Sequence, residues 1–266
     1  MDALSKKHIV NAQKQMSWVL FLSAFTLIVS VVAIGLGSSQ NLDFFTTLKI
    51  LFGIESAGKL ESAIIWELRF PRILMAIVGG ATLAIAGSLM QGSLGNPLVS
   101  PLTLGVASGA ALGAALAIIL DFSIVSNSNL AIVFNAFLFS LIVVAIIIQL
   151  GNYRSVSAES YILVGIAITF IAGAIVSTMQ YFATDAQLSQ LAHWSFGSLS
   201  RPTLVNTLWV SVALVGLLPF AFQKAWDLNT LALGGDDFAI STGVDPVKTR
   251  KHILILSAFM TSTVIA

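Results

Sequence analysis

Long runs of hydrophobic residues alternate along this chain with short polar stretches that contain most of its charges and prolines. A helix needs about 20 predominantly apolar residues to cross a bilayer core about 30 Å thick. Seven runs have this length, and the pattern therefore predicts seven transmembrane helices in a single all-α domain, residues 1–266. The runs are Trp18–Leu36, Arg72–Gln91, Leu102–Leu120, Leu130–Leu150, Ser160–Tyr181, Thr203–Phe222 and Pro246–Ala266.

The stretch Gln91–Pro101 interrupts a long segment that contains no charged residue. Asn96-Pro97 and Ser100-Pro101 must break the helix here, because proline removes a backbone donor and clashes with the preceding turn. Non-helical backbone is tolerated near membrane depth where protein buries it or where it lines a water-filled cavity. We therefore expect a turn that is buried in protein or faces such a cavity, rather than a solvated loop.

Local signals also predict where two helices begin. Ser100-Pro101 and Asp245-Pro246 each place a capping side chain directly before a proline at the first helical position.

Small residues recur at four-residue spacing within three of the predicted helices. In lipid, such faces let helix backbones approach closely and gain dispersion contacts. The pattern is typical of tight helix packing, and direct contact with a transported solute is the alternative. The residues are Gly80, Ala84 and Ser88, then Gly105, Gly109 and Gly113, and finally Gly165, Thr169, Gly173 and Ser177.

The composition supports an integral membrane protein. Hydrophobic residues make up 57% of the 266 residues, charged residues 9%, and the mean hydropathy is +0.94, whereas soluble domains contain about 25% charged residues. The net charge of +1 gives no basic footprint for nucleic acid. The interiors of the predicted helices contain no charged residue, which argues against a proton- or ion-coupled carrier.

The residues that commonly carry chemistry are scarce. There is no cysteine, and His8, His193 and His252 are far apart in the sequence, so we expect no metal site. Gly53–Leu60 has the spacing of a phosphate loop, but Leu60 stands where Mg²⁺ needs Ser or Thr. We expect neither a cofactor nor a catalytic site in this chain.

The basic residues predict the orientation of the chain. With the N-terminus inside, eight Lys and Arg residues fall in cytoplasmic segments and five in external ones, which favours this arrangement. The first apolar run is longer than the apolar region of a cleaved signal peptide, so we expect it to be retained as a helix.

Two polar segments are candidates for contacts with other proteins. Arg69 and Arg72 flank a proline on the predicted outer rim, where they either reach lipid headgroups or dock an acidic protein. The long inner loop contains a short predicted helix that Asp236 caps and that ends near Gly243. Its apolar side either folds back on the helix bundle or binds a partner; the apolar residues are Leu231, Leu233, Phe238 and Ile240.

One block of sequence resembles a known family. The segment Arg69–Ala114, "RFPRILMAIVGGATLAIAGSLMQGSLGNPLVSPLTLGVASGAALGA", is similar to the pattern of permeases from ABC importers of iron–siderophores, haem and vitamin B12. Two later segments match the same family in the right order, "WSFGSLS" (Trp194–Ser200) and "LNTLALGGDDFAISTGV" (Leu228–Val244). The resemblance covers almost the whole chain.

The resemblance implies roles for particular residues. Arg69 and Arg72 correspond to the arginines that dock the substrate-binding protein, and the fifth predicted helix, with Gly165, Thr169, Gly173 and Ser177, would line the translocation path. The cytoplasmic gate would comprise Gln91, Asn96, Pro97 and Leu98. The helices that couple to the ATPase would contain Asn229, Leu231, Leu233, Gly234, Asp236, Asp237, Phe238 and Gly243.

The family also implies the function and the partners. We expect a type II ABC importer permease subunit in the plasma or inner membrane that carries a metal chelate such as a ferric siderophore, haem or cobalamin. Its partners would be a cytoplasmic ATPase that binds ATP and Mg²⁺, an extracytoplasmic substrate-binding protein and a second permease copy, identical or paralogous. An ATP-independent transporter or channel and a non-transporting scaffold are the alternatives.

The sequence departs from the family at one end. Family members continue into a glycine-rich segment and further helices, usually ten in all, whereas this sequence stops at Ala266. The resemblance therefore implies a chain that is C-terminally incomplete relative to the family.

Overall fold

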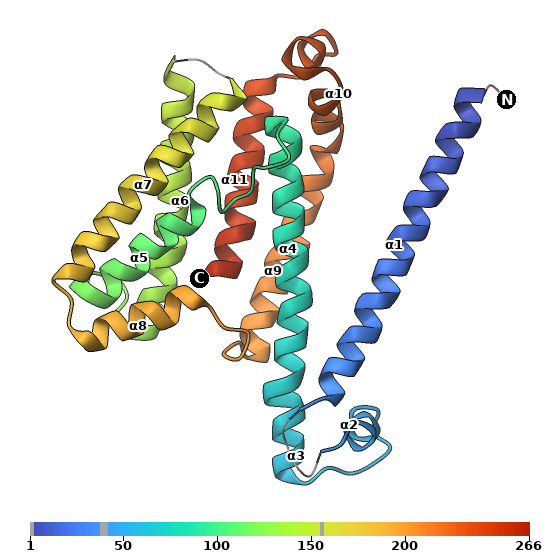
Figure 1. Cartoon of the computed structure of the whole chain (residues 1–266), viewed down its shortest axis with the longest axis vertical. Helices are drawn as coiled ribbons and strands as arrows, with labels where there is room; N and C mark the ends of the chain where they lie inside the picture. The colour runs from blue at the N-terminus through green and yellow to red at the C-terminus, as the bar shows by residue number, and fades with distance from the viewer. Residues whose placement is uncertain (1–2, 38–41, 155–156) are drawn as a thin grey trace. The chain divides into compact units, whose positions relative to one another are not determined.

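The computed structural model describes residues 3–37, 42–154 and 157–266, and all regular secondary structure in these ranges is helical (Figure 1). The predicted all-α fold is therefore confirmed. The helices are α1 (Ala3–Gly35), α2 (Phe44–Leu51), α3 (Lys59–Ala63), the π-helical segment η1 (Ile64–Arg69), α4 (Phe70–Leu94), α5 (Val106–Leu120), α6 (Ser128–Arg154), α7 (Ala158–Tyr181), α8 (Asp185–Phe196), α9 (Leu204–Gln223), α10 (Ala225–Ser241) and α11 (Pro246–Ile265).

The chain divides into two compact units. The first comprises Met1–Leu74 and Ser200–Leu204, and the second comprises Met75–Leu199 and Val205–Ala266. The first unit contains α1 to η1, and the second contains α5 to α8, α10 and α11.

Five described helical stretches are long and apolar enough to cross a membrane. Two of the seven predicted spans differ from this description: α5 has only 15 residues, and α11 begins with the basic residues Lys248, Arg250 and Lys251. The five stretches are Gln13–Gly35, Lys59–Leu94, Ser128–Gly151, Ala158–Tyr181 and Leu204–Gln223.

The second predicted span begins earlier than its apolar run suggested. It starts at Lys59 and continues through η1 into α4, although Pro71 lies near the start of α4. In η1 the backbone N–H of Phe70 reaches the carbonyl of Ile65, five residues back. Such a widened turn before a proline relieves the clash that would otherwise end the helix.

The core of the second unit is built around close contact between α5 and α6. A Cβ added to Gly109 would lie 2.8 Å from the Phe139 carbonyl oxygen, and one added to Gly113 would overlap the carbonyl of Asn135. These glycines therefore pack helix against helix, as predicted from their spacing. A further apolar cluster joins α4, α6 and α11 through Met90, Leu94, Val144, Ile147, Leu254 and Ala258.

The predicted start of α5 is wrong. Ser100-Pro101 does not begin the helix; residues 101–105 form successive turns, and α5 starts at Val106 with Gly105 as its left-handed N-cap, at φ 86°. The Thr103 hydroxyl accepts from the Ser100 N–H at 2.9 Å, and the Ser100 hydroxyl accepts from the Thr103 N–H at 3.2 Å. These local bonds satisfy the backbone in a turn and compete with helix formation.

The start of α11 is confirmed. Asp245 is its N-cap, its carboxylate accepts from the Lys248 N–H at 3.0 Å, and Pro246 occupies the first turn. Because this bond favours the ionised form, it lowers the pKa of the Asp245 carboxyl.

Candidate functional site

The connection from α4 to α5 begins with a turn that presents an apolar tip. We define this turn as Gln91–Leu98, so it includes the last four residues of α4. Gly95 adopts φ 60° at the end of α4, and the Asn96 side chain accepts from the Leu98 N–H at 2.9 Å. Pro97 and Leu98 are exposed, and 83% of the Leu98 surface is accessible. Gln91, near the end of α4, is also exposed, and Asn96 is half-buried.

Buried residues on the far side of this turn hold it in place. Val99 and Leu104 are buried, together with Val106, in the apolar cluster that joins α4, α6 and α11. The turn is therefore anchored at its C-terminal side while its tip remains accessible.

A second apolar surface lies on α10. Leu231 and Ala239 are buried and pack with each other, whereas Leu233 is 80% exposed, Ile240 62% and Phe238 43%. The same element is thus anchored on one side and exposed on the other. Leu231 thus packs within the chain, whereas Leu233, Phe238 and Ile240 are left exposed.

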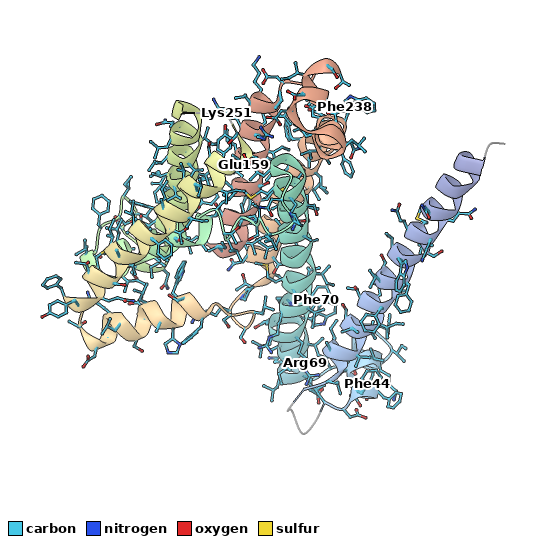
Figure 2. The ribbon with its side chains drawn as sticks, turned by 45° about the horizontal axis from the view of Figure 1, so that its top comes forward. Phe44, Arg69, Phe70, Glu159, Phe238 and Lys251 are labelled. Carbon is cyan, nitrogen blue, oxygen red and sulfur yellow. The ribbon has the colours of Figure 1, made fainter. Side chains whose placement is uncertain are left out.

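Two adjacent glycines shape α10. Gly235 has φ 69° and ψ −162°, which breaks the helix into two segments. Only glycine adopts this conformation readily. A Cβ at Gly234 would overlap the ring of Phe238, so the missing side chain lets that ring lie over the backbone. Figure 2 shows Phe238 on this element. The remaining predicted coupling residues, Asn229, Asp237 and Gly243, are all exposed.

Asp236 has a role that its position after two glycines did not reveal. Its carboxylate accepts from Nη1 of Arg250 at 2.8 Å and from Nη2 at 2.5 Å. The Nε of Arg250 donates to the backbone carbonyl of Ser93, near the end of α4, at 2.9 Å. The predicted N-cap role of Asp236 is replaced by this ion pair. In the sequence, Arg250 is one of the eight basic residues predicted to lie in cytoplasmic segments, and nothing in its neighbourhood indicates this contact.

Arg69 and Arg72 have different environments within the first unit. Arg69 is half-buried, and its Nη1 donates to the Ile34 carbonyl at 3.0 Å and to the Thr47 hydroxyl at 3.3 Å. Arg72 is exposed. Both side chains line a recess of about 370 Å³ whose other walls include Leu36, Ile64, Leu68 and Ile73.

The segment that receives Arg69 is itself locally ordered. Asp43 is the N-cap of α2, and hydrogen bonds from Thr46 lower the pKa of its carboxyl. The hydroxyl of Thr47 donates to the Asp43 carbonyl at 2.9 Å. Arg69 therefore joins the C-terminal end of α1 to the first turn of α2, and Figure 2 shows it near Phe44 of that helix.

The small-residue face of α7 divides into two halves. Gly165 is buried, and a Cβ there would lie 3.0 Å from the Leu104 side chain. Thr169 is half-buried and bonds the Gly165 carbonyl at 2.9 Å. Gly173 and Ser177 are exposed. In this structure the first half packs against the α4–α5 connection, and only the second half is open to a solute.

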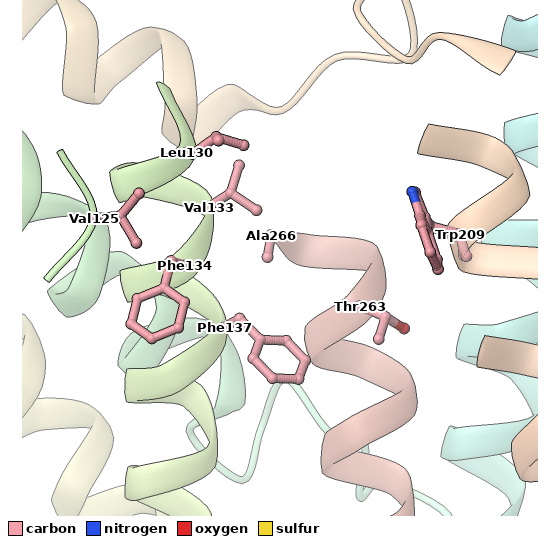
Figure 3. Close-up of a pocket in the computed structure, with 9 residues that line it drawn as sticks. Val125, Leu130, Val133, Phe134, Phe137, Trp209, Thr263 and Ala266 are labelled. Carbon is pink, nitrogen blue, oxygen red and sulfur yellow. The ribbon is translucent and has the colours of Figure 1, made fainter. Parts of the chain in front are cut away.

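A pocket in the second unit is a different kind of feature (Figure 3). It encloses about 460 Å³ between α6, α9 and the end of α11. Its lining consists almost entirely of apolar side chains, among them Phe134, Phe137 and Trp209. Such walls offer few polar groups to orient a charged or chelated solute.

The described residues contain no group of three His, Asp or Glu side chains placed to hold a metal ion. Comparison with known proteins assigns the family of this chain. The FecCD transport family model matches residues 24–266. The chain belongs to the FecCD transport family.

Curated relatives of this FecCD chain are transport permeases. Protein MJ0087 of Methanocaldococcus jannaschii, named as an ABC transporter permease, is 31% identical over 99% of this chain and 76% of its own length. The hemin transport system permease HmuU of Yersinia pestis is 33% identical over 90% of the chain and 72% of HmuU. The vitamin B12 import permease BtuC of Vibrio cholerae is 32% identical over 79% of the chain and 62% of BtuC.

A solved structure supports the same assignment. It is an inward-facing conformation of a transporter assigned to the metal-chelate type of ABC transporter, with a TM-score of 0.77 and 25% sequence identity. The match covers 94% of this chain and 75% of the other. This FecCD chain is therefore a multi-pass helical membrane protein of the transport permease type.

Proposed function

We propose that this chain is the transmembrane subunit of an ATP-driven ABC importer for a metal chelate of the ferric siderophore, haem or cobalamin class. Membership of the FecCD family supports the permease role, and the names of HmuU and BtuC support the cargo class. The chain itself would catalyse no covalent chemistry; a separate ATPase would bind ATP and Mg²⁺.

The surface of α10 carries this proposal. Leu233, Phe238 and Ile240 are exposed on an element that a buried side and a glycine kink hold in shape. Exposed apolar groups on an ordered element favour a protein partner, because burying them in an interface removes them from water. We assign this surface to the ATPase and place it in the cytoplasm.

The turn Gln91–Leu98 would act as the cytoplasmic gate. Leucine and amide side chains suit a constriction that packs shut, since charges there would lose their hydration at each closure. Narrow apolar constrictions also exclude water and solutes by dewetting. A second permease copy would supply the opposite side of the path, and the exposed Gly173 and Ser177 of α7 would face it.

An extracytoplasmic binding protein would deliver the chelate to the other face. Arg72, exposed at the edge of the recess, is the residue we assign to its docking, because cationic rim groups steer an acidic partner. In this arrangement the chain lies in the plasma or inner membrane, and its N-terminus is in the cytoplasm.

The ATPase assignment is tested with Phe238→Asp. A carboxylate in the centre of an apolar interface would be desolvated without a partner, so the ATPase should no longer co-purify and substrate-stimulated ATP hydrolysis should be lost. Phe196→Asp is the matched control, because Phe196 is also exposed but lies on α8, at the other end of the second unit from α10 (Figure 1).

Two results would contradict the proposal. ATP hydrolysis that remains stimulated by substrate in Phe238→Asp would remove the role of α10. Solute uptake by the purified chain, in vesicles that lack both nucleotide and ATPase, would favour an ATP-independent transporter.

A further inference from the structure

Arg250 is a buried cation that links three helices of the second unit. It belongs to α11, it is only 5% exposed, and its guanidinium bonds Asp236 of α10 and the Ser93 carbonyl of α4. Glu159 and Tyr161 of α7 also lie within range of its charge. Figure 2 shows Glu159, Phe238 and Lys251 at the same end of this unit.

The shape of the guanidinium fixes the position of Asp236 relative to the Ser93 carbonyl. Nη1 and Nη2 face the carboxylate of Asp236, while Nε faces Ser93. The group is planar and rigid, so a displacement of one partner must either carry the other along or break a charge-assisted bond. Breaking it is costly for Arg250, whose side chain is only 6% exposed, whereas the Asp236 side chain, 40% exposed, keeps access to water.

Both partners lie next to a glycine at which the backbone changes direction. Asp236 directly follows the kink at Gly235, and Ser93 lies two residues before Gly95, where α4 turns at φ 60°. Arg250 therefore connects the segment of α10 that follows the kink to the end of α4, where the Gln91–Leu98 turn begins. The other segment of α10 has its own link to α11, since the Thr249 hydroxyl donates to Asp227 at 3.4 Å.

We propose that Arg250 is a positioning residue that transmits movement of the segment Asp236–Ser241 to the α4–α5 turn. This inference deepens the proposed function, on which its meaning for transport depends. The geometric link can still be measured without any partner protein. Arg250 would touch neither the chelate nor the nucleotide.

The absence of cysteine from the sequence makes a direct measurement possible. Spin labels at Leu98→Cys and Ile240→Cys, both exposed positions, report the distance between the turn and the outer segment of α10. The labelled full chain is diluted with unlabelled chain, so that distances between copies do not contribute. We expect one narrow distance distribution in the parent and a broad or shifted one in Arg250→Met.

Lys248→Met is the matched control. Lys248 lies on the same first turns of α11, and its ion pair with Asp245 at 3.2 Å is exposed and involves no other helix. The distribution should therefore stay narrow. An unchanged distribution in Arg250→Met, or an equal broadening in Lys248→Met, would overturn the proposal.

Two further variants keep the test decisive if Arg250→Met does not fold, and they distinguish the ion pair with Asp236 from the bond to the Ser93 carbonyl. Asp236→Asn keeps the shape of the acceptor but removes its charge, and it should broaden the distribution even if Arg250→Met does not fold. In the exchange Asp236→Arg with Arg250→Asp, an ion pair can re-form, but a carboxylate cannot donate to the Ser93 carbonyl. A narrow distance distribution in the exchange variant would show that the bond to the Ser93 carbonyl is dispensable. A narrow distribution in Asp236→Asn would show that the ion pair is dispensable.

The amount of solute carried per ATP tests whether the contacts of Arg250 matter for transport. In vesicles with the ATPase, Arg250→Lys should keep ATP hydrolysis but lower the solute carried per ATP by about tenfold or more, the effect expected when one charge-assisted bond is lost. Unchanged transport per ATP would contradict the proposal. If the parent chain shows no ATP-dependent transport at all, the proposed function fails, while the distance measurement still decides the link itself.

Discussion

Arg69 and Arg72 differ by three positions in sequence and by their whole environment in the structure. The composition of the "RFPR" stretch suggested two equivalent rim cations. In the structure Arg69 bonds the carbonyl end of α1 and Thr47 of α2, and Arg72 is exposed. A cation at a helix C-terminus is favourable because it satisfies free carbonyls and opposes the helix dipole. Only Arg72 keeps its charge available for a partner.

Separate substitutions should resolve these two roles. Arg69→Ala should lower the free energy of unfolding of the first unit by about 1.5–3 kcal/mol, the usual contribution of hydrogen bonds made by a charged group. Arg72→Glu should leave it unchanged but weaken the docking of the binding protein and make the remaining affinity less sensitive to salt. Thermal unfolding in detergent and a salt titration of binding measure the two effects. Equal loss of stability in both variants would contradict the division.

Gly113 offers a second test at the scale of one residue. A methyl group there would overlap the Asn135 carbonyl of α6, so Gly113→Ala should force α5 and α6 apart and cost about 1–3 kcal/mol of stability. Gly216→Ala in α9 is the control, since no atom lies within 4 Å of its added Cβ. The same substitution there should be neutral or slightly stabilising, because alanine favours helix more than glycine. Unfolding midpoints of the two variants decide the comparison.

At the scale of elements, apolar run length predicted most helices, and local bonding decided where they begin. Asp245-Pro246 starts α11 as expected, whereas Ser100-Pro101 does not start α5. The two motifs look alike in sequence, but Thr103 bonds Ser100 in return and closes a turn. A capping signal therefore predicts a helix start only when no nearby hydroxyl offers the backbone an alternative.

The cap of α11 should make this helix sensitive to acid. The pKa of the Asp245 carboxyl is lowered below its usual 3.8 by the bond from the Lys248 N–H, so its contribution is present above that value. It is lost as the pH falls through the lowered pKa, because protonation removes the favoured acceptor. Asp245→Asn should flatten this dependence while retaining a cap, since asparagine caps helices about as well. Unfolding midpoints between about pH 2 and 6 test this, and identical slopes in both proteins would contradict it.

The candidate site was only partly accessible from the sequence. Gly234 and Phe238 could be predicted to lie in a partly helical inner segment, because a glycine pair and the apolar spacing are local signals, but the predicted cap by Asp236 was wrong. The contact of Arg250 with Asp236 and Ser93 could not, because it joins residues that are 14 and 157 positions apart. For the same reason the division of the α7 face remained hidden: its first half packs on Leu104 from another segment.

At the scale of the molecule, family membership and helix content agree on a membrane permease, while the energy source remains the proposal to test. Reconstituted vesicles with the ATPase and the binding protein should accumulate the chelate only when ATP is supplied. Omission of either partner should abolish uptake, because the chain would provide only the path. Uptake that persists without ATP would contradict the importer mechanism, and accumulation of radiolabelled cobalamin, haem or ferric siderophore measures it.

The shortness of α5 has a consequence for the membrane around it. A helix of 15 residues is about 22 Å long, so it is shorter than a hydrocarbon core of about 30 Å. The remaining depth beside it falls to the turns of residues 95–105, whose polar backbone does not tolerate contact with lipid tails. This backbone is therefore shielded by packing, as at the buried Val99 and Leu104, or by water. Because α5 alone is too short to cross the core, the seal at this place depends on how these turns pack rather than on the length of a helix.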